Sequence, residues 1–293
     1  MSVNDDNPTL VDFEQALPFL RAELHRYCAR MSGSVIDGED ILQEALIKAT
    51  EALQRGDAVD NLRAWLFRIA HNVAVNWFRA QSYRHNMKQQ LSHQEAETQA
   101  MPAVKEVEHG LRLFMHLPIK QRSAVVLRDI LGYTAEEVAE LTDSSLSAIK
   151  SALNRGREQL KILRESVNPK LTLSQQQDAL VVDYAQHFNA HNFNALRDML
   201  ADEVKLELVS RFSAQGKPTV SNYFGNYQKV DDWLVRTGFV EERPALLVFD
   251  KSNKDSTPVY FILLTFDQGE LIAIRDFRYA RYIMNDASWR VVD

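Results

Sequence analysis

The chain has almost no cysteine, no signal-peptide pattern and no long apolar run. Cys28 is the single cysteine among 293 residues, which excludes an intrachain disulfide and indicates no Cys-rich zinc site. Residues 1–14 are acidic and lack the cationic and apolar blocks of a secretory signal. Apolar runs such as residues 259–266 are far too short to span a bilayer. We therefore expect a cytoplasmic protein with no membrane contact, no metal ion and no cofactor.

Acidic side chains are missing from residues 61–91, although the chain as a whole carries a net charge of −6. The same stretch holds several basic side chains, whereas the segment before it is rich in aspartate and glutamate. The net charge argues against nucleic-acid binding by the whole surface. It does not exclude a local basic site, because the distribution of charge matters more than its sum.

Polar stretches divide the chain into candidate units. Its length allows two or three compact units, and its composition, 45% apolar and 25% charged, is that of an ordinary globular protein. Residues 82–106 are polar and lack a sustained apolar period, which predicts a flexible or weakly helical linker. Residues 165–174, with Pro169, predict a second boundary.

Residues 117–163 predict a helix-turn-helix. Thr134 and Glu137 can form a capping box at the start of a short helix, and Ser145 can cap the longer helix that follows. One face of the longer helix is apolar and packs inward. The opposite face carries cations and small hydrogen-bonding side chains, which suit phosphates and base edges. With the cap, these are Ser145, Ser147, Lys150, Ser151, Asn154, Arg155 and Arg157. The alternative is a helical hairpin whose charged face is only solvated.

Two further helices are predicted upstream, at residues 13–31 and 38–53, the second capped by Asp37. Leucines and alanines give the second helix a buried stripe. Its outer face is polar except for one isoleucine, and it consists of Asp40, Gln43, Glu44, Ile47 and Lys48. An isoleucine inside a polar face indicates a docking surface, but single exposed apolar residues are also normal.

Residues 61–85 predict a helix in which aromatic side chains alternate with cations and amides. Single-stranded DNA is bound by such a mixture, because bases stack on aromatic faces and phosphates attract cations. Trp65 and Trp77 are nevertheless expected in the core. The polar candidates are Arg63, Arg68, His71, Asn72, Asn76, Arg79 and Arg84.

These motifs together resemble the extracytoplasmic-function (group IV) bacterial sigma factors. The resemblance rests on DILQEALIKA, LRAWLFRIAHNVAVNWFR and the helix-turn-helix in that order, and it covers about residues 13–163. It implies two all-α domains, residues 10–85 and 107–164, joined by a linker at residues 86–106. It further implies that the outer face of helix 38–53 binds core RNA polymerase. The helix at residues 61–85 would then recognise and melt the minus-ten promoter element, and the helix-turn-helix would read the minus-thirty-five element.

The chain departs from the family pattern in two respects. Asn76 stands where many relatives carry aspartate, and Ala148 and Ala152 give the recognition helix a small-residue context. The promoter sequence therefore cannot be transferred from relatives.

Residues 175–293 predict a separate α+β unit. A helix is expected from Ala179 into residues 191–200, and another at residues 220–235. Strands are expected at residues 204–208, 245–250, 259–267 and 270–279, with a hairpin turn at Gln268 and Gly269. The stretches NAHNFNALRDMLADEVKLELV, NYFGNY and IRDFRYARYI resemble the SnoaL-like branch of the nuclear-transport-factor fold, which implies a cone-shaped domain.

That resemblance implies a conical pocket, which could bind a small-molecule ligand. Its candidate lining is aromatic and comprises Tyr184, Phe188, Tyr223 and Trp233, although an ordinary core would use the same residues. Related cones include isomerases and cyclases, but no spacing among Asp202, Glu207, Asp276 and His191 indicates an acid–base pair. Asp276 is instead expected at a strand end, ion-paired with a neighbouring arginine.

The most economical hypothesis is therefore a non-enzymatic initiation factor whose partners are core RNA polymerase and promoter DNA, with a C-terminal domain that modulates its activity. Two alternatives remain. One is a ligand-sensing helix-turn-helix regulator that does not bind polymerase, and the acidic helix at residues 38–53 argues against it. The other is a SnoaL-like cyclase or isomerase fused to a DNA-binding module.

Overall fold

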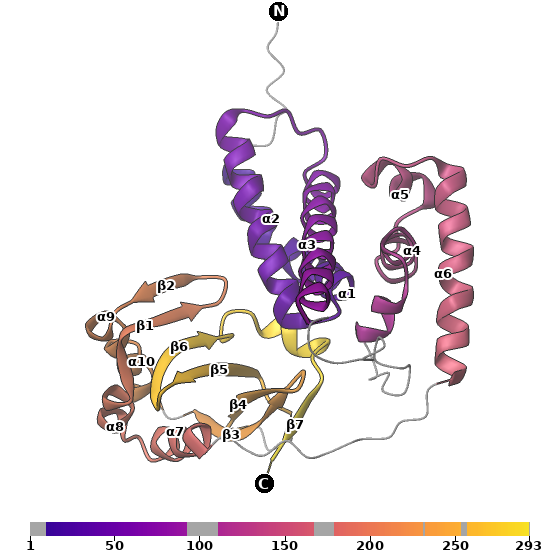
Figure 1. Cartoon of the computed structure of the whole chain (residues 1–293). Helices are drawn as coiled ribbons and strands as arrows, with labels where there is room; N and C mark the ends of the chain where they lie inside the picture. The colour runs from indigo at the N-terminus through magenta and orange to yellow at the C-terminus, as the bar shows by residue number, and fades with distance from the viewer. Residues whose placement is uncertain (1–9, 93–110, 167–178, 231, 253–256, 293) are drawn as a thin grey trace, which may run out of the picture. The chain divides into compact units, whose positions relative to one another are not determined.

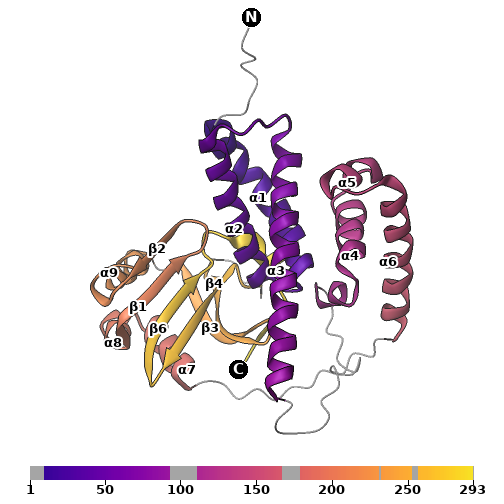
Figure 2. The same cartoon turned by 45° about the horizontal axis from the view of Figure 1, so that its top comes forward.

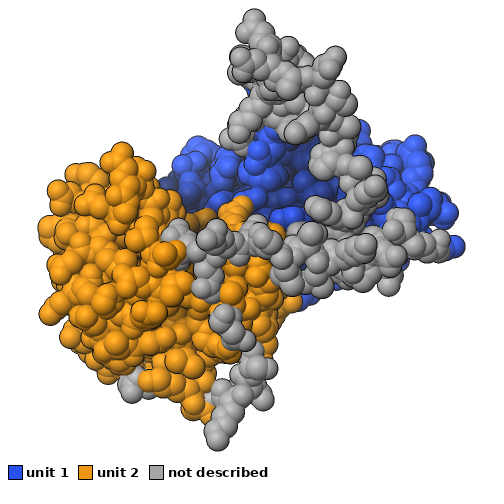
Figure 3. Space-filling view, turned by 60° about the horizontal axis from the view of Figure 1, so that its bottom comes forward, with its two compact units in different colours: residues 1–171 blue, residues 172–293 orange. Residues whose placement is uncertain are grey.

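The computed structural model describes residues 10–92, 111–166, 179–230, 232–252 and 257–292. The chain divides into two compact units, Met1–Leu171 and Thr172–Asp293, which Figure 3 distinguishes by colour. The boundary between them falls within the stretch predicted as a boundary, residues 165–174. Most of that stretch lies outside the described residues.

Three long helices form the first half of unit 1. They are α1 (Leu10–Ser32), α2 (Val35–Arg55) and α3 (Leu62–Ser92), which pack side by side (Figures 1 and 2). Ser34, not Asp37, caps α2: its hydroxyl accepts the backbone N–H of Asp37 at 3.1 Å. The helix therefore begins earlier than predicted. Val35 and Ile36 belong to its first turn and are buried. Helix α3 also continues to Ser92, past the predicted boundary at residue 85.

The second half of unit 1 is the predicted helix-turn-helix. It consists of η2 (Leu111–His116), α4 (Ile119–Val125) with its π-helical continuation η3 (Val126–Ile130), α5 (Ala135–Leu141) and α6 (Leu146–Ser166). The capping box is confirmed, since the Thr134 hydroxyl accepts from Glu137 N and the Glu137 carboxylate accepts from Thr134 N. The Ser145 hydroxyl likewise accepts from Ala148 N at 3.2 Å, at the start of α6.

One hydrophobic core joins the two halves of unit 1. It includes Leu24 of α1, Phe67 of α3 and Val125 of α4, all nearly inaccessible to solvent. Trp65 and Trp77 are partly buried against the same core, which supports the structural role expected for them. The two predicted helical domains are thus packed together as one compact unit.

Unit 2 is an α+β domain, as predicted. Its sheet has the order β2-β1-β6-β5-β4-β3-β7, with β1 and β6 parallel and the other neighbours antiparallel. The strands are β1 (Leu200–Leu208), β2 (Phe212–Gln215), β3 (Trp233–Val240), β4 (Arg243–Asp250), β5 (Tyr260–Asp267), β6 (Glu270–Asp276) and β7 (Trp289–Val291). The helices are α7 (Ala179–Asn189), α8 (Phe193–Asp198), α9 (Lys217–Ser221) and α10 (Phe224–Gln228), with the short 3-10 helix η4 (Arg281–Asn285) before β7. Helices α7 to α10 contribute to a core shared with the sheet.

Two helix predictions for unit 2 were wrong. The helix expected over residues 220–235 is two short helices followed by β3, in which residues 233–236 alternate between buried and exposed as in a half-buried strand. The helix expected to continue past Asn189 ends there, because His191 takes a positive φ of 56° and Asn192 caps α8. The hairpin at Gln268 and Gly269 is confirmed, with Asp267 paired to Glu270.

Candidate polymerase and nucleic-acid interfaces

The residues predicted to bind polymerase lie on the outer face of α2. Asp40, Glu44, Ile47 and Lys48 are exposed and Gln43 is half-buried. Ile47 is 59% exposed, and Glu44 and Lys48 form an ion pair of 2.6 Å across one helical turn. The stripe that includes Ile41, Ala45 and Ala49 is buried on the other side. This face therefore presents two carboxylates and an apolar side chain to solvent.

Helix α6 presents the predicted DNA-binding face to solvent. Its polar residues Ser147, Lys150, Ser151, Asn154, Arg155 and Arg157 are exposed, as is the cap Ser145. Ile149, Ala152 and Leu153 are buried on the opposite side. Gly156 permits close packing onto α4, because a Cβ there would lie 2.8 Å from a methyl carbon of Val125.

Arg157 differs from the other cations of α6. Its guanidinium donates two hydrogen bonds to the Asp129 carboxylate, at 2.5 and 2.9 Å. A bidentate pair of this kind fixes the arginine side chain and compensates its charge. Lys150 and Arg155 are therefore the cations of α6 that we expect to contact phosphates.

Some of the minus-ten candidates on α3 are only exposed to solvent, and others contact α1 or the helix-turn-helix. Asn76 and Arg79 are exposed, while the side chain of Arg84 lies outside the described residues. Arg63 instead pairs with Glu23 and lies over the ring of Tyr133, 4.3 Å from its centroid. Arg68 lies 3.7 Å from Glu140 of α5.

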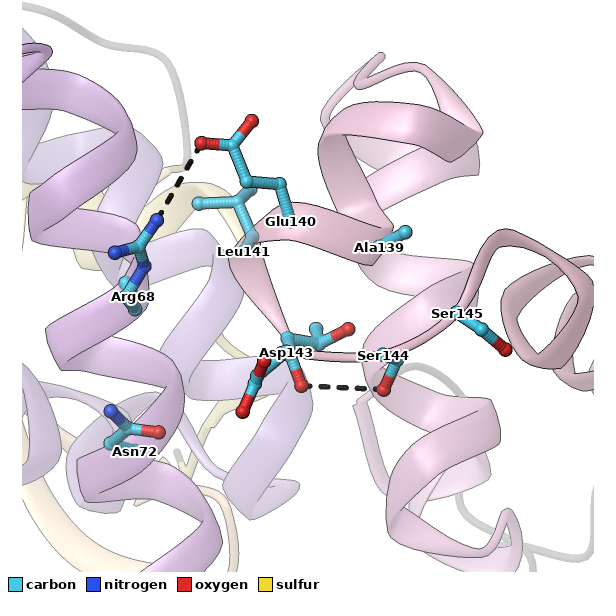
Figure 4. Close-up of a pocket in the computed structure, with 9 residues that line it drawn as sticks. Arg68, Asn72, Ala139, Glu140, Leu141, Asp143, Ser144 and Ser145 are labelled. Carbon is cyan, nitrogen blue, oxygen red and sulfur yellow. Dashed lines mark hydrogen bonds and ion pairs between the residues drawn. The ribbon is translucent and has the colours of Figure 1, made fainter.

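A pocket of about 800 Å³ separates α3 from the turn of the helix-turn-helix (Figure 4). Arg68 and Asn72 line one wall, and residues 139–145 line the other. In Figure 4 the Arg68 guanidinium points toward the Glu140 carboxylate. These two members of the α3 set thus face the helix-turn-helix.

His71 takes part in a polar cluster between α1, α3 and α4. Its Nδ1 lies 2.7 Å from the Tyr27 hydroxyl and 3.1 Å from the Ser123 hydroxyl, and these two hydroxyls are 3.0 Å apart. Burial disfavours the imidazolium and lowers the pKa of His71 to about 4. The neutral imidazole takes part in this cluster through Nδ1, so the structure gives His71 a role inside unit 1.

The pKa of His71 leads to a testable pH dependence. An unfolded histidine titrates near pH 6.5. The stabilisation of unit 1 by neutral, folded His71 is therefore complete above that pH. It is lost as the pH falls from about 6.5 toward about 4. We expect an NMR titration of the full chain to show His71 titrating near pH 4, with the signal assigned by its disappearance in His71→Gln. A midpoint near 6.5 would contradict the buried neutral imidazole.

Arg122, for which the sequence predicts no role, is fully buried between the two halves of unit 1. Its guanidinium donates to the carbonyl oxygens of Met31, Met115 and Leu117 and lies over the ring of Phe78. Met31 is in the last turn of α1, where the helix dipole favours a cation. Burial nevertheless lowers the pKa of Arg122 to about 10. No local pattern marks this role, because Arg122 and Met31 are 91 residues apart.

The four residues predicted to line a pocket in unit 2 pack against one another and their neighbours. Phe188 lies 4.7 Å from Trp233 and 5.8 Å from Tyr184, measured between ring centroids. Tyr223 packs 5.3 Å from Tyr227, and all five side chains are buried. These contacts form an aromatic cluster inside unit 2, and a ligand pocket at these residues stays a prediction.

Asp276 is at the end of β6, as expected, but its carboxylate accepts hydrogen bonds from two tyrosine hydroxyls. It is fully buried, and its carboxylate accepts the hydroxyls of Tyr223 at 2.9 Å and Tyr227 at 2.7 Å. Burial raises the pKa of Asp276, while these donors oppose that change. The neighbouring Arg275 pairs with Glu207 instead, at 2.7 Å.

No grouping of three His, Cys, Asp or Glu side chains suitable for a metal ion occurs in the described ranges. Among the helices described, none has both the length and the hydropathy that a membrane crossing needs.

Two family models match unit 1, one for each of its halves. The model for sigma-70 region 2 matches residues 17–84, and the model for sigma-70 region 4 matches residues 111–160. The first match contains α2, with its predicted docking face, and most of α3. The second contains the helix-turn-helix.

The chain is also similar to curated sigma factors. It is 28% identical over 227 residues to the ECF RNA polymerase sigma factor SigG of Mycobacterium tuberculosis, an alignment that covers 67% of this chain and 61% of SigG. It is 30% identical over 151 residues to the ECF RNA polymerase sigma-E factor of Escherichia coli K12, covering 46% of this chain and 78% of that protein.

Solved structures align with both units. The sigma factor SigJ of Mycobacterium tuberculosis is 17% identical, with 90% of this chain and 95% of SigJ covered and a TM-score of 0.36. A putative polyketide cyclase from Sinorhizobium meliloti is 15% identical, with 34% of this chain and 94% of that chain covered and a TM-score of 0.28. On the two family models and the similarity to sigma-E, the chain belongs to the extracytoplasmic-function family of RNA polymerase sigma factors.

Proposed function

We propose that the chain binds core RNA polymerase through the outer face of α2 and directs the enzyme to promoters through α3 and α6. The observation that carries this proposal is the joint presence of an exposed acidic α2 face and an exposed basic α6 face within the two sigma-70 matches. The role needs no chemical step by the chain itself. Because RNA polymerase and its DNA template are in the cytoplasm, we expect the protein to act there.

The second candidate is a helix-turn-helix regulator that binds DNA without polymerase. The exposed face of α6 would serve either function. The α2 face favours the sigma hypothesis, because two carboxylates beside an exposed isoleucine are of no use to a protein that contacts only DNA phosphates.

Selection from a randomised duplex library separates the two candidates. We expect core polymerase together with the chain to enrich two sequence elements at a fixed separation, and core polymerase alone to enrich neither. Enrichment of the same elements by the chain alone would favour the regulator. The absence of enrichment with both components present would contradict the proposed function.

We further propose that unit 2 modulates the activity of unit 1. The two units are covalently joined through residues 167–178, and a short connection gives unit 2 a high effective concentration near unit 1. Its buried Asp276 and aromatic core make it an independently packed domain. A small-molecule ligand of this domain remains a prediction from its SnoaL-like resemblance.

Truncation tests this role of unit 2. A chain that ends at Leu171 keeps α6 intact, because this helix ends at Ser166. We expect the truncation to change transcription from a cognate promoter severalfold at equal protein concentration. Phe188→Ala is the control: an aromatic core truncation typically costs about 3–5 kcal/mol and would disrupt the folding of unit 2 without removing it. If the truncated chain equals the full chain in polymerase binding, promoter choice and transcript yield, unit 2 has no modulating role.

A further inference from the structure

Tyr83 differs from the other Phe, Trp and Tyr residues of α3, all of which are described, because its side chain is exposed to solvent. It is 66% accessible. Trp65 and Trp77 are packed partly against the core of unit 1, and the Arg122 guanidinium covers the ring of Phe78 at 4.8 Å. In the described part of the chain, no hydrogen bond, ion pair or ring contact engages the Tyr83 side chain. Both faces of its ring are therefore open to a partner.

Tyr83 shares one stripe of α3 with Asn76 and Arg79. An α-helix turns by about 100° per residue, so residues with spacings of three, four and seven lie within about 60° of one another. All three side chains are exposed, and Ala80, one turn before Tyr83, is exposed and too small to cover the ring. The stripe is about 10 Å long, which corresponds to about three nucleotides at about 3.4 Å each. An amide, a guanidinium and an aromatic ring are thus presented together over that length.

The charge around Tyr83 indicates which kind of partner the stripe fits. Residues 61–91 contain no aspartate or glutamate. The exposed Ile47 of α2, by contrast, shares its face with two carboxylates, which suits a basic protein surface. An exposed ring beside a cation and an amide suits nucleic acid, because bases stack on aromatic faces and phosphates attract guanidinium groups.

A merely solvated tyrosine is the alternative, since single exposed apolar side chains are normal. Phe19 of α1 is such a case: it is 83% exposed, and no cation stands three or four residues from it. Tyr279 of unit 2 is exposed as well, but Arg211 lies over its ring at 4.8 Å. Tyr83 and Arg79 instead combine an uncovered ring with a cation that has no ion pair among the described residues.

We propose that the ring of Tyr83 stacks on an unpaired base of single-stranded DNA, while Arg79 binds a neighbouring phosphate and Asn76 a base edge. The inference rests on the minus-ten role proposed for α3 and adds a stacking residue to it. Every base has a π-face, so stacking tolerates any sequence, but the face is accessible only where the strand is unpaired. Tyr83 therefore favours melted DNA over the duplex and contributes to promoter opening.

Fluorescence anisotropy of the full chain with a single strand of mixed sequence, about 15 nucleotides long to exceed most single-strand site sizes, tests the stacking. Tyr83→Phe keeps the ring and should bind as tightly as the unaltered chain. Tyr83→Leu keeps an apolar side chain without a π-face, and its affinity should fall on the order of tenfold. The corresponding duplex should bind all three proteins equally, because its bases are already stacked on one another.

Phe19→Leu is the matched control, because it makes a comparable change at an exposed aromatic side chain elsewhere in unit 1. It should leave single-strand affinity unchanged. Arg79→Gln should weaken binding and lower the salt slope by about one, as expected for a phosphate contact. Equal losses in Phe19→Leu and Tyr83→Leu, or equal losses of single-strand and duplex affinity in Tyr83→Leu, would overturn the stacking role.

The fluorescent adenine analogue aminopurine reports on the stacking itself, because its emission is quenched when it stacks on an aromatic ring. Complexes of core polymerase and the full chain are formed on the selected promoter, with the analogue placed singly along the non-template minus-ten strand. One position should be quenched with the unaltered chain and with Tyr83→Phe, and should brighten with Tyr83→Leu. If no position distinguishes the unaltered chain from Tyr83→Leu, the ring does not stack on a base.

These measurements separate the stacking role from the sigma function. A selective loss of single-strand affinity in Tyr83→Leu supports the stacking role even if polymerase is never recruited. Recruitment and a promoter-dependent transcript, with neither DNA measurement responding to Tyr83→Leu, support the sigma function and overturn the stacking role. An unaltered chain that binds single-stranded DNA neither alone nor with core polymerase overturns it as well.

Discussion

Asp40→Arg combined with Glu44→Arg is expected to abolish co-purification of the chain with core RNA polymerase. Both side chains are exposed on α2, so the reversal leaves the buried stripe of Ile41 and Ala45 unchanged. Like charges placed opposite each other across an interface cost several kcal/mol, which corresponds to a loss of affinity of about a hundredfold or more. Fluorescence anisotropy of labelled chain titrated with core polymerase measures the change directly.

The control reverses two exposed acids that lie away from α2. Glu14 in α1 and Glu270 in β6 are both exposed, and Glu14→Arg with Glu270→Arg gives the same change in net charge. We expect this variant to retain polymerase binding. If both double variants lose affinity equally, the effect follows net charge, and the α2 face is not the docking surface.

The second large effect is expected on α6. Lys150→Ala and Arg155→Ala each remove a cation from its exposed face. Loss of a base contact costs about 1–3 kcal/mol, whereas loss of a phosphate contact lowers the salt slope by about one. The double variant should therefore bind the minus-thirty-five element at least tenfold more weakly at low salt, with a shallower dependence of log affinity on log salt. Gel-shift titrations at several salt concentrations measure both quantities.

Lys120→Ala is the matched control for α6, because Lys120 is an exposed cation on α4. It should leave affinity and salt slope unchanged. If Lys150→Ala and Arg155→Ala behave like Lys120→Ala, the DNA-binding face of α6 is assigned wrongly. A parallel test on Arg157 should show a smaller effect, since Asp129 already holds its guanidinium.

Local patterns predicted the parts of the site that depend on neighbouring residues. The capping box at Thr134, the exposed faces of α2 and α6, and the hairpin before Glu270 all follow from spacings of a few residues. Helical and strand periodicity together with capping chemistry determines these features. Strand β3 was missed because two short helices precede its start at Trp233, which made the whole stretch resemble one helix.

Contacts between residues far apart in the chain, in both units, could not be predicted in this way. His71 meets Ser123 across 52 residues and Tyr27 across 44, and Asp276 meets Tyr223 across 53. Such partners are set by how helices and strands pack, and a single sequence contains no periodic signal for them. The cations of α3 were therefore identified as a group, while the structure pairs Arg63 with Glu23 and Arg68 with Glu140 and leaves Arg79 exposed.

Run-off transcription with purified core RNA polymerase tests the central claim most directly. The template carries a promoter obtained by the library selection, and the samples contain core polymerase with the full chain, with the Asp40→Arg/Glu44→Arg variant, or alone. A sigma factor predicts a transcript of defined start with the full chain only. If core polymerase with the full chain yields no transcript above core polymerase alone, although the chain binds the same DNA, the account of this protein as a promoter-directing sigma factor is contradicted.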